Sequence, residues 1–170
     1  MLLALLLFFS QLTWATLETP PLPAENILFF MQKDGDTNIV VYLLNFDHKG
    51  KLNPEKPICA VWLKDLVNRK APAFYRKPES SLYGFECKPV ADEYFEIRLN
   101  ACEKMPLYLK RAPETGKHQI YIRDEDREYL LKRIYMRVAG RKGRSARIQH
   151  LDLVTVNSLS GIEFLKRINI

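Results

Sequence analysis

The side chains with the clearest capacity to bind another molecule gather between residues 137 and 147. Gly140 and Gly143 interrupt this basic segment and leave its tip free to adapt. Arginine and lysine hold phosphate or sulfate groups through charge, and arginine adds paired hydrogen bonds. We therefore expect an anion-binding loop, against the plainer interpretation of a solvated hairpin tip. The cations of the basic segment are Arg137, Arg141, Lys142, Arg144 and Arg147.

A second group combines tyrosines with arginines, mostly opposite the aliphatic residues of predicted strands. Tyrosine and arginine are enriched at the energetic centres of binding interfaces, so their exposed side chains could form a recognition surface. The alternative is cross-strand pairing that stabilises the outer face of a sheet. The residues of this predicted surface are Tyr94, Arg98, Tyr108, Tyr121, Arg123 and Tyr135.

A polar segment that starts at Asn45 begins like a calcium loop, with Asp47 two residues on and Gly50 for the turn. Lysine stands at positions 49 and 56, however, where such a loop needs oxygen ligands. We therefore interpret the segment as a polar hairpin loop and predict no metal site.

Acids and histidines offer only weak candidates for catalysis. His150 and Asp152 share one strand face and could pair, but no Gly-x-Ser-x-Gly elbow accompanies them or the other histidines, His48 and His118. Hydrolysis of a glycosidic bond needs two carboxyl groups across a cleft. The acids available for it are Glu93, Glu96, Glu114, Asp124 and Asp126. The sequence predicts no catalytic residue and no cofactor.

Strands must position these groups, because apolar and polar residues alternate along most of the chain from residue 82 onward. Upstream, Asp34-Gly35 separates two β-prone runs, 26–32 and 39–44, and predicts a hairpin. Glu128 to Arg137 has helical spacing in part, but its aromatic and β-branched content favours a strand. We expect an all-β fold, an antiparallel sandwich or barrel of about nine or ten short strands with little helix. The predicted core includes Phe95, Ile97, Leu99, Ile120, Ile122, Ile134 and Met136.

The first 25 residues differ from the rest. Residues 1–15 resemble a secretory signal peptide, since an apolar run ends in Thr13-Trp14-Ala15. A proline-rich linker follows over residues 16–25, and one β domain over residues 26–170. We therefore expect an exported protein, periplasmic or extracellular. An oxidising compartment would permit a disulfide between Cys87 and Cys102, although small buried thiols are the alternative.

The charge balance favours acidic partners. The formal net charge is +6 at pH 7, which suits contact with an anionic envelope polymer or lipid head groups. No nucleic-acid-binding signature is present, and nucleic acid is not the expected partner of an exported chain.

Several segments resemble an uncharacterised family of small exported bacterial proteins, domain-of-unknown-function family 4833. The most specific is Asn53-Pro54-Glu55-Lys56-Pro57-Ile58 followed by Trp62. The others are Leu28–Gln32, Asn38–Tyr42, Tyr83-Gly84 and Met105–Leu109. The resemblance implies an exported single domain and attaches no activity to it.

These observations predict a non-enzymatic binding or envelope-associated module. The alternatives are a hydrolase acting on an envelope polymer, and a carrier of a small apolar ligand if the barrel encloses a cavity.

Overall fold

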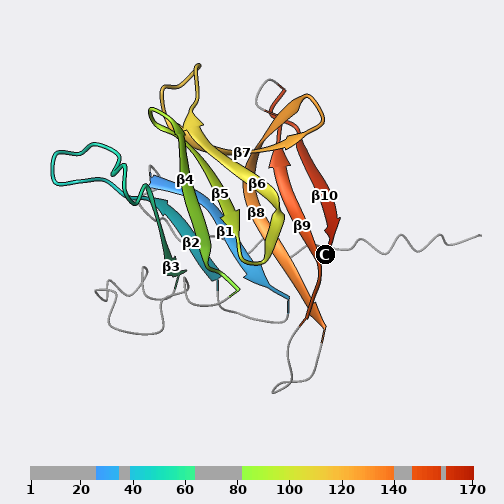
Figure 1. Cartoon of the computed structure of the whole chain (residues 1–170). Coiled ribbons are helices and arrows are strands. Elements are labelled where there is room, and N and C mark those ends of the chain that lie inside the picture. The colour runs from blue at the N-terminus through green and yellow to red at the C-terminus, as the bar shows by residue number, and fades with distance from the viewer. Residues whose placement is uncertain (1–25, 35–38, 64–81, 140–146, 158–159) are drawn as a thin grey trace, which may run out of the picture.

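A computed structural model describes residues 26–34, 39–63, 82–139, 147–157 and 160–170 of the chain (Figure 1). The predicted signal peptide and linker, and the segment 64–81, lie outside these ranges. So do Arg141, Lys142 and Arg144 of the basic segment. In the described ranges, no helix has both the length and the apolar character needed to cross a membrane.

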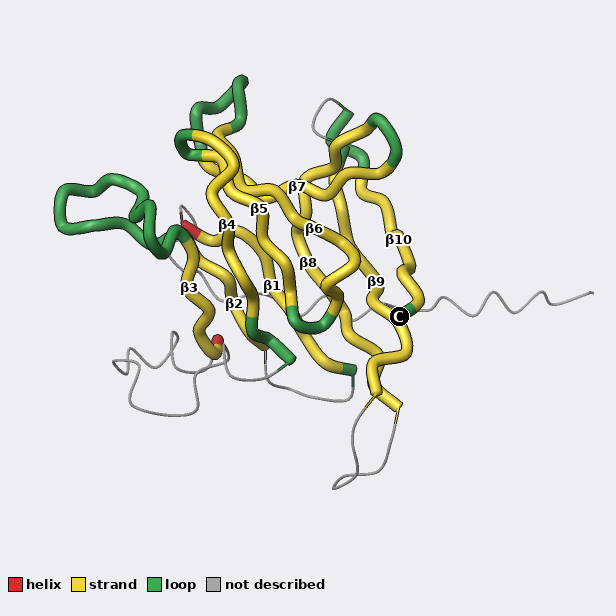
Figure 2. The backbone as a smooth tube through the Cα atoms, viewed as in Figure 1, coloured by secondary structure: helices red, strands yellow, loops and turns green. Residues whose placement is uncertain are grey.

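Ten strands make up most of the described chain, which confirms the predicted all-β class (Figure 2). The segment 128–137 is a strand, as its aromatic and β-branched content favoured. The strands are β1 (Ile27–Lys33), β2 (Ile39–Leu44), β3 (Ile58–Trp62), β4 (Phe85–Ala91), β5 (Tyr94–Leu99), β6 (Cys102–Arg111), β7 (His118–Asp124), β8 (Arg127–Ala139), β9 (Arg147–Val156) and β10 (Glu163–Asn169).

The long strand β8 organises the sheet. One edge of β8 pairs with β9, which in turn pairs with β10. The other edge is divided: β7 pairs with the first residues of β8, and β1 pairs with residues 133–136. Two limbs therefore leave β8 on the same side, β1-β2-β3 and β7-β6-β5-β4.

The predicted antiparallel arrangement needs one correction, because β1 and β8 run parallel and the sheet is mixed. The reason is that β1 and β8 are not neighbours in sequence. Adjacent strands joined by short turns are antiparallel, as the β1–β2 hairpin is, whereas a distant pair has no such constraint.

The two limbs face each other and enclose the core, as in a half-barrel (Figure 1). The ring of Tyr42 in β2 stacks on Phe29 with the centroids 4.2 Å apart and meets Phe85 of β4 edge-on. Its hydroxyl donates a 2.7 Å hydrogen bond to the carbonyl oxygen of Tyr83, just before β4. Trp62 of β3 also packs edge-on against the Tyr83 ring. These contacts join the ends of the two limbs.

The alternation of apolar and polar residues along the strands correctly predicted which residues are buried in the core. All seven residues predicted for it are buried, and Leu107, Leu109, Leu151 and Leu153 join them as their alternation indicated. The stiff, branched side chains of these strands fill the space between the limbs without polar groups.

Candidate functional site

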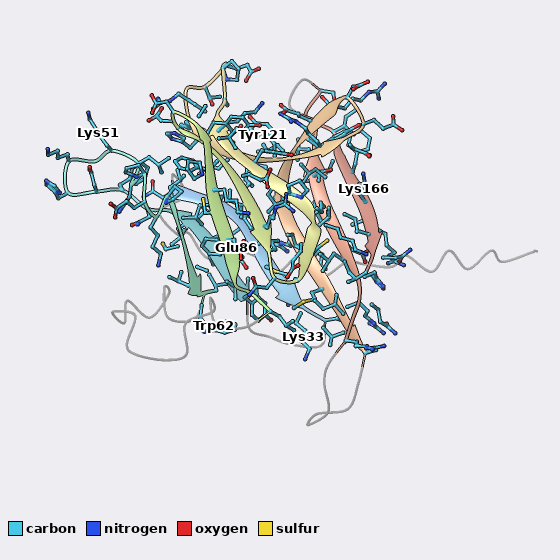
Figure 3. All side chains as sticks on the ribbon, viewed as in Figure 1. Lys33, Lys51, Trp62, Glu86, Tyr121 and Lys166 are labelled. Atoms are coloured by element: carbon cyan, nitrogen blue, oxygen red, sulfur yellow. The ribbon has the colours of Figure 1, made fainter. Side chains whose placement is uncertain are left out.

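The outer face of β8, β9 and β10 carries a groove of about 990 Å³, which we call the β8–β10 groove. Its lining includes Lys33 at the end of β1, Asp34 just after it, and Phe164 and Leu165 on β10, of which Leu165 faces the groove and Phe164 packs on Tyr129. Both β10 residues are exposed, Leu165 to 64%. Figure 3 shows the side chains of β9 and β10 and labels Lys33, which lines the groove, and Lys166, which does not line it and pairs with Asp124.

The cationic side chains that β8 contributes to the groove come from alternate residues of the strand. Arg133, Tyr135 and Arg137 are two residues apart and all line it. Arg133 donates a 2.8 Å hydrogen bond from Nη1 to the Tyr135 hydroxyl oxygen, and its guanidinium lies 5.5 Å from the centre of the Phe30 ring. These contacts fix the guanidinium while leaving its charge without a carboxylate partner among the described residues.

The other arginines of the groove are neutralised. Arg137 forms an ion pair with Asp34. Arg167 of β10 binds both carboxylate oxygens of Asp152, at 2.7 and 2.8 Å. The hydrogen bonds from Arg167 hold the pKa of Asp152 below its ordinary value. Asp152 is therefore ionised and acts as an anchor for Arg167, not as a proton donor.

The pairing predicted for His150 and Asp152 has a structural counterpart. His150 lies on β9 with Nε2 3.7 Å from an oxygen of Asp152. Because Arg167 holds the same carboxylate more closely, the imidazole is a secondary neighbour. The described residues bring no serine or cysteine to this pair to complete a nucleophilic triad.

Of the basic segment, the structure describes only the two ends. Arg137 lines the groove on β8, and Arg147 is exposed at the start of β9, opposite Ala139 in the ladder. The three residues between them that carry the predicted loop charge lie outside the described residues.

The predicted Tyr–Arg recognition surface divides into two parts. Tyr94, Tyr108 and Arg123 meet on the outer face of β5, β6 and β7, where the Arg123 guanidinium lies 4.4 Å from the Tyr108 ring centre. Arg123 also donates to the Tyr94 hydroxyl at 3.1 Å and to Glu128 at 3.1 Å. Tyr135 instead belongs to the β8–β10 groove.

Two members of that surface are engaged with their own neighbours. Arg98 pairs with Glu96 on the same strand at 2.7 Å. Tyr121 was predicted to be exposed but is 4% exposed, which corrects that expectation. It lies between Tyr108 and Leu130 in the ladder, and the Lys110 ammonium covers its ring at 5.0 Å. Cross-strand pairing thus accounts for much of this face.

The remaining predicted features are local. Asp47 accepts backbone N–H bonds from Lys49 and Lys51, and Gly50 has a φ of 72°, which makes the calcium-like segment a polar turn.

Cys87 and Cys102 are free thiols, half-buried and buried respectively.

The groove residues that sequence reasoning missed are Arg133 and Arg167. The Arg133-x-Tyr135-x-Arg137 pattern was a usable signal, because alternation places all three on one face. For Arg167 no signal was available, since its partner Asp152 comes from another strand.

The comparisons with known proteins give a family and no further relative. No curated protein and no solved structure matches the chain. One family model matches residues 29–167, which span every strand from β1 into β10. The chain therefore belongs to the family described as Domain of unknown function (DUF4833).

Proposed function

We propose that this protein is an exported, non-enzymatic binding module whose β8–β10 groove holds an anionic group of an envelope polymer or lipid. The observation that carries the proposal is Arg133, a guanidinium oriented by Tyr135 and Phe30 with no carboxylate partner among the described residues. A guanidinium fixed in this way loses little conformational entropy when it binds phosphate, sulfate or carboxylate.

The surroundings of Arg133 favour a negative ligand. Four cationic side chains line the groove, against three acids. Two of the acids are committed to arginines, so an incoming anion competes with Asp34 and Asp152 only at Arg137 and Arg167. Arg147 adds a further positive charge at the start of β9. The cations are Lys33, Arg133, Arg137 and Arg167.

Apolar surface beside these charges supports a polymer or lipid rather than a bare ion. Leu165 exposes its side chain in the groove, and Tyr135 is 37% exposed. Sugar rings and acyl chains have apolar faces that would cover such side chains, and Tyr beside Arg is the composition of binding hot spots.

Binding is supported better than hydrolysis. A glycosidase needs a carboxyl group whose pKa is raised so that it can donate a proton. The hydrogen bonds from Arg167 instead lower the pKa of Asp152, an acid of this groove.

The test compares Arg133→Gln with Arg127→Gln, an exposed arginine at the start of β8 outside the groove. Each variant removes one positive charge. Elution from a heparin column and co-sedimentation with phosphatidylglycerol vesicles should weaken for Arg133→Gln and stay near wild type for Arg127→Gln. Equal losses in the two variants would show that only net charge matters, and the proposed groove would be wrong.

A further inference from the structure

A separate cleft of about 740 Å³ opens at one end of the two limbs. There the loop between β2 and β3 faces the turn between β4 and β5 and the start of β7 (Figure 2). Pockets for small molecules commonly measure about 300 to 1,000 Å³. The cleft shares no lining residue with the β8–β10 groove.

His118, the first residue of β7, carries an unsatisfied polar atom in this cleft. Its side chain is 7% exposed, and Nε2 is buried with no hydrogen-bond partner among the described residues. Leaving a buried polar atom unpaired is costly, and most such atoms in folded proteins have a hydrogen-bond partner. Burial also lowers the pKa of His118, so the imidazole is neutral at pH 7.

Glu93 faces His118 from the β4–β5 turn. Its Oε2 lies 3.7 Å from His118 Nε2, which is too long for a direct hydrogen bond. The carboxylate is held from the other side by Arg111, whose Nε and Nη2 donate to it at 2.9 and 3.0 Å. Arg111 also donates to the carbonyl oxygen of Gly116 at 3.1 Å, which joins the turn to the β6–β7 loop. The Glu93 carboxylate is therefore positioned before any ligand arrives.

The charges of the cleft cancel. Three cations and three acids line it: Lys51, Arg111, Lys117, Asp47, Asp92 and Glu93. An anionic ligand at His118 would meet the Glu93 carboxylate, and a cationic one would meet Arg111, which already neutralises that carboxylate. A neutral ligand meets neither penalty.

We propose that this cleft binds a neutral, hydroxyl-rich molecule, such as a pyranose unit, with one hydroxyl between His118 Nε2 and Glu93. A hydroxyl both donates and accepts, so it can donate to the carboxylate and accept from Nε2–H. The two atoms are only 3.7 Å apart, so one oxygen about 2.8 Å from both would bridge them. Because Nε2 is buried in the described structure, one of the two side chains must turn to admit that oxygen.

Apolar side chains in the same cleft suit the carbon face of a sugar ring. Phe46, 37% exposed on the β2–β3 loop, and Leu52 lie among its lining residues. A pyranose presents hydroxyl edges and an apolar face, which match the polar and apolar halves of the cleft.

The test is saturation-transfer NMR on the full chain with four neutral methyl pyranosides: the glucoside, mannoside, galactoside and N-acetylglucosaminide. Glucuronate and glucosamine serve as the charged probes. We expect at least one neutral pyranoside to bind and to shift the His118 imidazole ¹⁵N signal. His118→Phe and Glu93→Gln should each weaken that binding about tenfold. Phe46→Ala, which changes an exposed side chain, tests the same cleft without disturbing a buried residue.

Glu96→Gln and Arg133→Gln are the controls, since Glu96 pairs with Arg98 outside the cleft and Arg133 lies in the other groove. Both should bind the pyranoside like wild type, whatever the result for heparin. The proposal is overturned if none of the four neutral probes binds, if only a charged probe binds, or if binding survives in the His118, Glu93 and Phe46 variants alike.

Discussion

Replacing Tyr42 with phenylalanine tests how the two limbs of the sheet are held together. The change removes one hydroxyl and keeps the ring, which stacks on Phe29 and is fully buried. That hydroxyl donates to the carbonyl oxygen of Tyr83, 41 residues away in the chain. Burial raises the pKa of Tyr42 above its ordinary value, which keeps the donor protonated at any ordinary pH.

The cost follows from what the substitution leaves behind. The Tyr83 carbonyl oxygen loses the hydrogen bond from the Tyr42 hydroxyl in a buried setting, and such a loss costs about 1–3 kcal/mol. The ring contacts with Phe29 and Phe85 persist, so the hydrophobic contribution changes little. With a urea m-value of about 2 kcal/mol/M, the unfolding midpoint should fall by about 0.5–1.5 M.

Urea unfolding followed by far-UV circular dichroism measures this midpoint. The matched control is Tyr135→Phe, because Tyr135 is exposed and its hydroxyl accepts from Arg133 at the surface. A surface change of this kind should stay within about 0.5 kcal/mol. If Tyr42→Phe is no more destabilised than Tyr135→Phe, the Tyr42–Tyr83 hydrogen bond does not hold the limbs together.

Three further predictions concern the core, the pH response and a thiol. Ile97→Ala and Ile120→Ala should each destabilise by about 2–5 kcal/mol in urea unfolding, since both are buried; unchanged midpoints would mean the buried faces are wrong. Burial lowers the pKa of His118 below 6.5 in the folded chain, so the unfolded chain takes up the proton first. The free energy of unfolding should therefore be highest above pH 6.5 and fall as the pH drops below that value. His118→Gln should remove the difference between the urea unfolding midpoints measured at mildly acidic and at neutral pH. Burial raises the pKa of Cys87 to about 11, so peptide mapping after iodoacetamide at neutral pH should find Cys87 modified far more slowly in the native protein than in urea.

The fold was predictable wherever the sequence alternates. Phe95, Ile97 and Leu99 stand two apart among polar residues, and a pleated strand can bury only that set. β10 gave no such signal, because Ile162, Phe164 and Leu165 are apolar yet exposed and charged residues lie on both faces. The parallel pairing of Phe30 with Arg133 was also hidden, since nothing in either segment specifies a partner so distant in sequence.

The candidate sites were predictable only in their local parts. Arg137 and Tyr135 stood out by type and spacing, and both line the groove. The environment of His118 could not be predicted from the sequence, because Glu93 reaches it from the β4–β5 turn and Arg111 from the end of β6. Burial of Tyr121 was likewise missed, since alternation separates two faces but does not tell which of them neighbouring side chains will cover.

The division of one β8 edge between two limbs has a consequence for the order in which the chain folds. Apart from the pairing of β8 with β1, the strands from β4 to β9 pair only with neighbours in sequence, through short-range hairpins that close quickly. β1 instead pairs with β8, a strand far away in the sequence. Asp34 and Arg137, whose ion pair joins the ends of these strands, are 103 residues apart. The β1–β2–β3 unit can form early, but it has no strand to pair with until β8 has formed. We expect docking of this N-terminal unit to be the slow, late step, and its unpaired β1 edge to be the region most exposed to mispairing before that step.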